Sequence, residues 1–351
     1  MDVSLILNQA KGLWTRGDAF LAASPVLSRI GAGLAVLIGL VLAFLVIRSV
    51  FRMLAAVHRA ATAASIQRMK DVGARMLVVR GGGGRRGAVG RFLRQTADQH
   101  LSDFMFGGPF RVIPFPGTIS NEQEADLLLR RTGADLLMWG ERQRGTRGVA
   151  RIASRPSSPF EKRRPAQTLR MPDKKAMWTE ALSRAVAYAA AKQFRPALGR
   201  PQDFRSERLQ PVVENLLEIL AEKPAADPKL LAEMVDDAAS GALQLAFAGD
   251  EAWLDQSVEI TRATLTDINR SEAPDRWIAA KINLGRALRL KAEKRFDPVL
   301  LRESIEHLSE ALDALRTEPR FKLAESAAQA IADAQRLLGA RRKFSISSGG
   351  V

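Results

Sequence analysis

The sequence predicts an α+β protein of several domains, in which one transmembrane helix precedes a small α/β domain and an all-α domain of helical hairpins. Three observations predict this fold class. A run of 18 residues near the N-terminus lacks charge, strand patterns alternate with helical ones in residues 74–172, and later residues show only helical patterns with an internal repeat. The expected segments are an amphipathic segment 1–29, a transmembrane helix 30–52, a juxtamembrane helix 53–73, a basic α/β domain 74–172, a connecting helix and linker 173–205, a helical repeat domain 206–340 and a disordered tail 341–351.

Composition sets outer limits on the function. A chain of 351 residues is long enough for two modest domains, each with its own core. The absence of cysteine excludes disulfides, thiolate metal sites and cysteine nucleophiles. The net charge of +15 is concentrated in residues 48–210, whereas residues 211–351 are mildly acidic. This asymmetry predicts an anionic surface beside the basic part, either lipid headgroups or a polyanion.

The uncharged run extends from Ile30 to Ile47 and is bounded by Arg29 and Arg48. At 1.5 Å per residue it is about 27 Å long, close to the roughly 30 Å of bilayer hydrocarbon. Because the nearest small-residue site, Ala61-Thr-Ala63, lies beyond several arginines, we interpret the run as a permanent anchor rather than a signal peptide. The preceding segment 1–29 has one apolar face, which suits a helix lying in the membrane interface or one packing on a partner protein.

Basic residues predict the orientation of the anchor. The C-terminal side of the run carries Arg48, Arg52 and Arg59 close to the membrane, followed by further basic residues and no acid. The N-terminal side carries fewer basic residues and one aspartate. The positive-inside rule therefore predicts that the C-terminal domains lie in the cytoplasm, beside anionic lipid headgroups.

Residues 74–172 show the period of an α/β domain. Strand patterns occupy residues 75–80, 111–115, 136–141 and 149–153, and residues 167–171 supply a possible last strand. One helical stripe runs from Val89 to Phe104. A second helix is expected to begin at Ser120, with Gln123 completing a capping box, and to end at Gly133.

The segment Thr132-Gly-Ala-Asp-Leu-Leu-Met-Trp-Gly-Glu141 places a hydrophobic strand between Gly133 and Gly140. With the elements around it, residues 74–172 resemble the small α/β domain at the N-terminus of TolB and related domains that precede TPR arrays in bacterial signalling proteins. The resemblance implies a bacterial inner-membrane protein whose α/β domain makes protein contacts and has no catalytic residues. Some of these relatives are extracytoplasmic.

A glycine-rich loop follows the first strand and contains Gly81, Gly83, Arg85 and Arg86. A strand, a glycine loop and a helix N-terminus are the parts that bind phosphate in other proteins. The lysine and hydroxyl residues of a P-loop are missing here. Two interpretations remain: a flexible loop that displays its arginines, or a site for an anion such as a nucleotide or lipid headgroup.

The C-terminal part contains an internal repeat. Helical patterns occupy residues 211–222, 228–247, 251–268, 274–294, 298–315 and 320–338. The series Asp250, Leu254, Ser257, Val258, Glu259 and Leu265 recurs 47 residues later as Asp297, Leu301, Ser304, Ile305, Glu306 and Leu312. A period in the forties built from helix pairs predicts stacked helical hairpins.

The second copy, Trp277 to Leu315, resembles a TPR. Asn283-Leu-Gly285 matches the first helix of that motif, and Ser304, Leu308 and Ala311 match the second. The resemblance implies a short groove lined by first helices, for which Asn283, Arg286 and Arg289 are candidates. The alternative is that these three residues are solvated on an outer face.

No pattern for catalysis or for a cofactor is present in the sequence. The histidines His58, His100 and His307 are scattered, and there is no nucleophile elbow or metal-binding spacing. We therefore expect a membrane-anchored, non-enzymatic scaffold that recruits a protein partner through the repeats. The alternative is a sensor that binds an anionic small molecule or nucleotide at Gly81–Gly87. Nucleic-acid binding is disfavoured because aromatic residues are only 6% of the chain.

Overall fold

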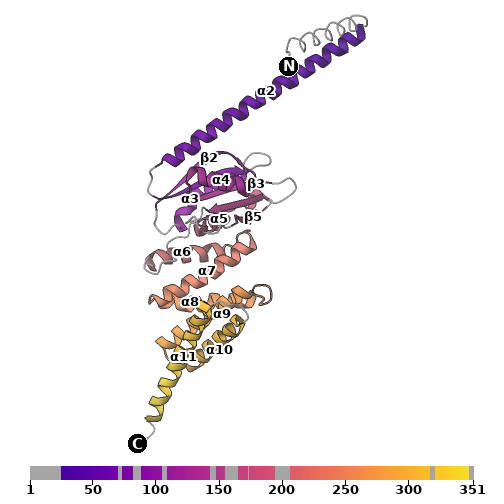
Figure 1. Ribbon diagram of the computed structural model, residues 1–351. Helices are drawn as coiled ribbons and strands as arrows, with labels where there is room; N and C mark the ends of the chain where they lie inside the picture. The colour runs from indigo at the N-terminus through magenta and orange to yellow at the C-terminus, as the bar shows by residue number, and fades with distance from the viewer. Residues whose placement is uncertain are drawn as a thin grey trace, which may run out of the picture. The chain divides into compact units, whose positions relative to one another are not determined.

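The computed structural model describes residues 25–69, 73–81, 88–104, 109–142, 148–154, 165–172, 174–193, 206–316 and 321–347 (Figure 1). The chain divides into two compact units, Met1–Ala63 and Ala64–Val351. The first unit contains most of one long helix, and the second contains a sheet and the C-terminal helices.

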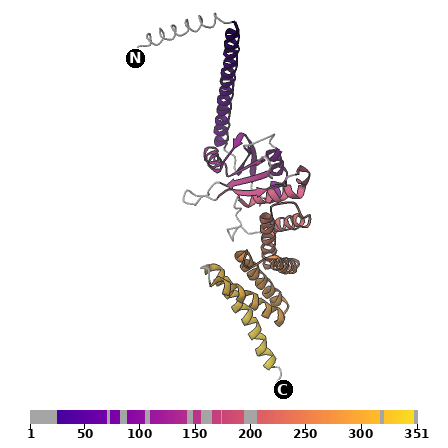
Figure 2. The same cartoon turned by 90° about the vertical axis from the view of Figure 1, so that its right-hand side faces the viewer.

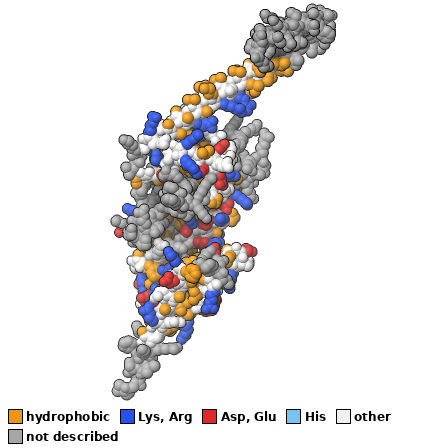
Figure 3. Space-filling view, viewed as in Figure 1, with side chains coloured by type: hydrophobic (Ala, Val, Ile, Leu, Met, Phe, Trp, Pro, Cys, Tyr) orange, Lys and Arg blue, Asp and Glu red, His pale blue; other side chains and the backbone are white. Residues whose placement is uncertain are grey.

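Helix α2, Pro25–Arg68, is a single α-helix of 44 residues. The sequence divides this region into a transmembrane helix and a separate juxtamembrane helix, but the structure shows no break between them. The reason is that residues 40–68 contain neither glycine nor proline, so nothing interrupts the backbone ladder. By length and composition α2 can cross a membrane, and hydrophobic side chains lie exposed along it (Figure 3).

The sheet has five strands in the order β2-β1-β3-β4-β5. The strands are β1 Ala74–Gly81, β2 Phe110–Ile119, β3 Leu136–Arg142, β4 Gly148–Ser154 and β5 Gln167–Arg170. Strand β1 is parallel to both β2 and β3, and the other pairs are antiparallel. The predicted strands and the predicted hairpin are therefore confirmed, including the possible last strand.

Helices cover both faces of the sheet. Helix α3, Ala88–His100, continues into the 3-10 helix η2, Leu101–Phe104, and lies on one face, whereas α4, Glu122–Thr132, contacts β2, β3 and β4. Gly133 ends α4 in the left-handed region with a φ of 65°, as the sequence predicts. The predicted capping box was placed one residue too early. The N-cap is Asn121 rather than Ser120. The side chain that reaches back to the start of the helix is Glu124 rather than Gln123, and its carboxylate accepts a hydrogen bond from the Ser120 N–H.

Helix α5, Glu180–Gln193, belongs to the sheet and is not a free connector. It follows the short 3-10 helix η3, Lys175–Met177, and packs against α3, where the Ser183 and Thr96 hydroxyls form a buried hydrogen bond of 2.7 Å. One hydrophobic cluster joins β1, α3 and α5 to Leu216 of α6 and Met234 of α7. The sequence suggested two separate cores, whereas the apolar packing runs without interruption from the sheet into the first C-terminal helices.

The C-terminal helices are α6 Ser206–Ala221, α7 Pro228–Phe247, α8 Glu251–Asp267, α9 Pro274–Lys294, α10 Pro298–Leu315 and α11 Phe321–Ser347. Each packs against the next in sequence, as both views show (Figures 1 and 2). Helix α6 begins before Pro211 because buried Leu209 already belongs to its apolar face. Helix α11 extends to Ser347, past residue 341 at which the sequence predicts a disordered tail to begin, and the rest of that predicted tail lies outside the described residues.

The internal repeat corresponds to equivalent positions in space. Asp250 and Asp297 are the N-caps of α8 and α10, and each side chain accepts a hydrogen bond from the first turn. Further along these two helices, the hydroxyls of Ser257 and Ser304 are buried. Each donates to a backbone carbonyl of the preceding helix, Ala239 O at 3.4 Å and Gly285 O at 2.6 Å respectively. The helices α7/α8 and α9/α10 are therefore two copies of one hairpin.

Candidate functional site: the face between the first helices α7 and α9

The first helices of the two hairpins are joined by polar contacts. The guanidinium of Arg276 on α9 forms a bidentate pair with the Asp236 carboxylate on α7, at 2.6 and 2.8 Å. About one turn further along α7 and two turns further along α9, Asn283 Nδ2 donates to Ser240 Oγ at 3.1 Å. Because residue numbers rise together along both helices, α7 and α9 run parallel. This is the arrangement expected of stacked hairpins, in which first helices are neighbours.

Arg286 lies further along the same face. Its guanidinium carbon is 4.9 Å from the centre of the Phe247 ring, at the last residue of α7, in cation–π geometry. Burial lowers the pKa of Arg286, and the nearby charge of Arg289 lowers it further. Within the described part of the chain, no carboxylate pairs with the Arg286 guanidinium.

Arg289 is one turn beyond Arg286 on α9. Its Nη1 donates to Glu293 on the same helix at 2.8 Å, and its side chain is 15% exposed. Its Nε is buried and has no hydrogen-bond partner among the described residues. Arg286 and Arg289 thus lie one turn apart, and of these two guanidinium groups only that of Arg289 pairs with a carboxylate among the described residues, which leaves an excess of positive charge at this end of the face.

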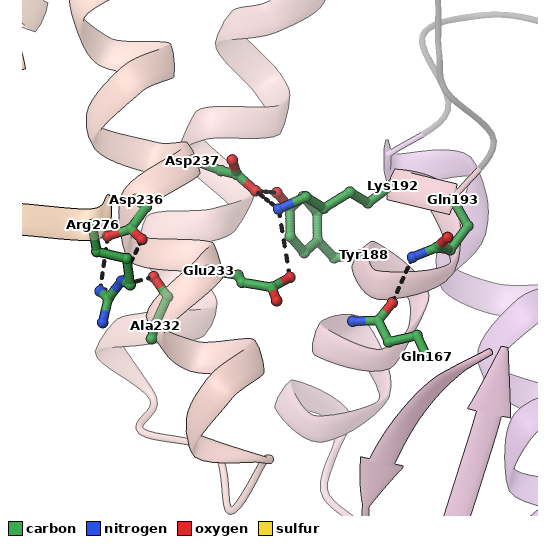
Figure 4. A network of polar contacts seen from close by, with 9 residues as sticks. All are labelled: Gln167, Tyr188, Lys192, Gln193, Ala232, Glu233, Asp236, Asp237 and Arg276. Atoms are coloured by element: carbon green, nitrogen blue, oxygen red, sulfur yellow. Dashed lines mark hydrogen bonds and ion pairs between the residues drawn. The ribbon is translucent and has the colours of Figure 1, made fainter. Parts of the chain in front are cut away.

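A second polar network joins α7 to helix α5, which packs on the sheet (Figure 4). Asp237 on α7 accepts hydrogen bonds from the hydroxyl of Tyr188 and, at 2.5 Å, from the Lys192 ammonium, both on α5. Lys192 also pairs with Glu233 at 3.5 Å. Burial, and then the charge of Asp237, raises the pKa of Tyr188 far above its ordinary value, so this phenol remains a neutral donor. The network holds the first hairpin in a fixed relation to α5.

An open cavity of about 480 Å³ lies beside this network. It is lined by residues 165–169 around strand β5, by Lys192 and Gln193 of α5, and by the start of α7. The Gln193 side-chain amide donates to Gln167 at 2.8 Å across it. The lining carries two lysines, Lys192 and Lys229, and two carboxylates, Asp227 and Glu233, so its formal charges balance.

A third cluster joins the second hairpin internally. The Lys281 ammonium is 2.5 Å from Glu310 and 3.0 Å from His307 Nδ1, and it lies over the Trp277 ring at 5.3 Å. Burial, and next the charge of Lys281, lowers the pKa of His307. The described residues contain no group of three or more histidine, aspartate or glutamate side chains that could hold a metal ion.

The structure places the predicted site residues in three regions. Asn283, Arg286 and Arg289 all lie on α9, and the first two contact α7. Arg48, Arg52 and Arg59 are exposed on α2, where spacings of four and seven residues put them within about 40° of one another. Gly81 ends strand β1, whereas Gly83, Arg85 and Arg86 lie outside the described residues.

Sequence reasoning missed the partners that complete this face. Phe247, Ser240 and Asp236 come from the copy before α9 in the chain, and no local pattern distinguishes them from other helix positions. Tyr188 was placed in a connecting helix, although a lone tyrosine in an alanine-rich helix was a usable signal. Comparison with protein-family models, with curated proteins and with solved structures found no match to this chain.

Proposed function

We propose that this chain is a membrane-anchored, non-enzymatic scaffold that presents a TPR-like helical surface to a protein partner. Helix α2 anchors it in a bacterial inner membrane, with the C-terminal part in the cytoplasm. The face between α7 and α9 binds the partner. The continuous packing from the sheet to α7 supports this role, because a scaffold needs its binding surface to be packed firmly on the domain that carries it.

The observation that carries the proposal is the environment of Arg286. Its guanidinium is partly buried over Phe247, and the described residues give it no carboxylate. Removing a charged group from water is unfavourable unless an opposite charge compensates. A carboxylate supplied by a partner compensates it here, and arginine beside an aromatic ring is typical of protein interfaces. The partner segment is therefore acidic.

Anionic lipid has a separate role at the membrane. Arg48, Arg52 and Arg59 share one side of α2, and each basic residue close to an anionic leaflet contributes roughly 1 kcal/mol of attraction. These residues set the depth of the helix and do not contact the partner. Nucleic acid has no part in the proposal.

Site-specific photocrosslinking in intact membranes tests the partner-binding face. A photoreactive amino acid replaces Phe247 in the full-length protein, and a control carries it at Val299, which is 64% exposed at the start of α10. We expect a defined crosslinked protein from position 247 only. Arg286→Glu should abolish that adduct, whereas Arg302→Glu, on the exposed side of α10, should preserve it. An adduct that survives Arg286→Glu at full yield would remove the basis for this function.

A further inference from the structure

We infer that the outer edge of strand β5 binds an extended, acidic peptide segment of a partner protein, which adds a strand to the sheet. Strand β5 is the last in the order β2-β1-β3-β4-β5, so only its side facing β4 is paired within the sheet. The other side borders the cavity of about 480 Å³ between β5 and the start of α7. This site is separate from the face between α7 and α9.

One hydrogen bond shows which backbone groups of β5 face the cavity. The Arg170 N–H donates to the Asp227 carboxylate on α7 at 3.2 Å, so this N–H points away from β4. In an antiparallel pair, residues bond to the neighbouring strand and point outward in alternation. Thr168, two residues before Arg170, therefore directs both its N–H and its C=O outward, whereas Leu169 bonds to β4. Within the described part of the chain, nothing pairs with these two groups of Thr168.

The two edges of the sheet differ in their protection against strand addition. Strand β2, at the opposite edge, carries Pro114 and Pro116, which have no N–H to donate. Prolines in an edge strand are a common defence against pairing with another chain. Strand β5 contains no proline, and Asp227 closes its edge only at Arg170. The stretch that remains open is therefore short and includes Thr168.

The cavity beside this edge has room for a short peptide. Its volume of about 480 Å³ falls within the roughly 300–1,000 Å³ that ligand sites occupy. The paired amides of Gln167 and Gln193 and the ion pair of Lys192 with Glu233 form part of its wall (Figure 4). Because these side chains are bonded to one another, the outward N–H and C=O of Thr168 remain for a ligand. An extended backbone supplies the complementary C=O and N–H.

Charge selects the side chains of that peptide. The formal charges of the cavity lining balance, but both of its carboxylates are engaged. Asp227 accepts from two backbone N–H groups, and Glu233 pairs with Lys192. Lys229, in the first turn of α7, and Arg170 are exposed, and neither side chain pairs with a carboxylate of the described residues. Opposite charges on neighbouring strands attract each other, so aspartate or glutamate in the added strand is favoured over lysine or arginine.

Peptide selection on the full-length protein in detergent tests this site. The protein carries Arg286→Glu throughout, so that the face between α7 and α9 does not capture acidic peptides. A phage-displayed library of random heptapeptides is selected, and enriched peptides are synthesised with blocked ends. We expect aspartate or glutamate to be enriched. Thr168→Pro removes the outward N–H without removing a bond to β4, so it should weaken binding at least tenfold. Thr168→Val, the matched control, keeps that N–H and should bind equally.

A second variant and a second measurement keep the test specific to this edge. Lys229→Glu changes an exposed side chain and should weaken the acidic peptides at least threefold, which serves also if Thr168→Pro does not fold. Amide exchange in residues 166–170 should slow when a peptide is bound. The inference is overturned if no peptide is enriched, if basic peptides are enriched, or if either variant, once folded, binds as tightly as the parent protein.

Discussion

The substitution Gly285→Ala tests the packing of the second hairpin. A Cβ built on Gly285 of α9 would lie 2.5 Å from Leu308 Cγ and 3.1 Å from the Ser304 carbonyl oxygen of α10. Leu308 is fully buried, and its Cγ is not a free end that rotates away. Overpacking of this kind costs about 1–3 kcal/mol, and the better helix propensity of alanine returns about 1 kcal/mol. The expected net loss is about 0–2 kcal/mol.

Gly339→Ala is the matched control. It makes the same chemical change in helix α11, where an added Cβ meets nothing within 4 Å. Only the propensity gain remains, so this variant should be neutral or up to about 1 kcal/mol more stable. Thermal unfolding of the full-length protein in detergent separates the two, since 1 kcal/mol moves Tm by about 2–4 °C in units of this size.

A double-mutant cycle makes the test specific to the contact. Leu308→Ala alone should cost about 2–5 kcal/mol, because it leaves a cavity in a buried cluster. Combined with Gly285→Ala it should cost less than the two single losses together, since the new methyl group occupies part of that cavity. The reasoning fails if Gly285→Ala matches Gly339→Ala in stability, or if the two changes at 285 and 308 are additive.

Three further predictions concern other buried polar contacts of the structure. Ser304→Ala should lower the free energy of unfolding by about 1 kcal/mol, and Ser257→Ala should lower it by less, because the hydrogen bond of Ser304 is 2.6 Å long and that of Ser257 is 3.4 Å long. Denaturant unfolding measures both losses, and equal losses would contradict this reasoning. The single tyrosine, Tyr188, should show no ultraviolet ionisation near pH 10 while the protein is folded, and stability should fall above pH 10 because only the unfolded state then releases this proton. Tyr188→Phe should remove that part of the pH dependence. NMR should show that His307 titrates with a pKa below its ordinary value of 6.5, and a titration at that ordinary value would refute the prediction. The free energy of unfolding should fall as pH drops through 6.5, because the unfolded state then binds a proton that the folded state does not. His307→Gln should remove this pH dependence.

The local features of this fold could be predicted because their determinants are close together in sequence. The prolines at the starts of α7, α9 and α10 and the capping residues Asp250 and Asp297 mark helix ends within one or two residues. The strands of the sheet were identifiable from short apolar runs. An error occurred where two adjacent residues offered the same chemistry, as with Ser120 and Asn121.

The candidate site was only half predictable. Asn283, Arg286 and Arg289 could be selected from a repeat pattern, but their partners Ser240 and Phe247 lie roughly one repeat earlier in the chain. Nothing in a local pattern states which turn of α7 meets which turn of α9. Which turns meet depends on the angle at which the two hairpins cross, and side-chain packing around the intervening helix α8 sets that angle.

The sequence by itself determined which segments form helices and strands, that one helix is apolar enough for a bilayer, and that two hairpins share a design. Only the tertiary structure decided that α5 covers the sheet, that its core continues into α6 and α7, and that Arg286 lies over Phe247. The physical reason is one of range. Periodicity, caps and turn residues act over a few positions, whereas a shared core and a pair such as Tyr188 and Asp237 require segments far apart to be brought together by packing.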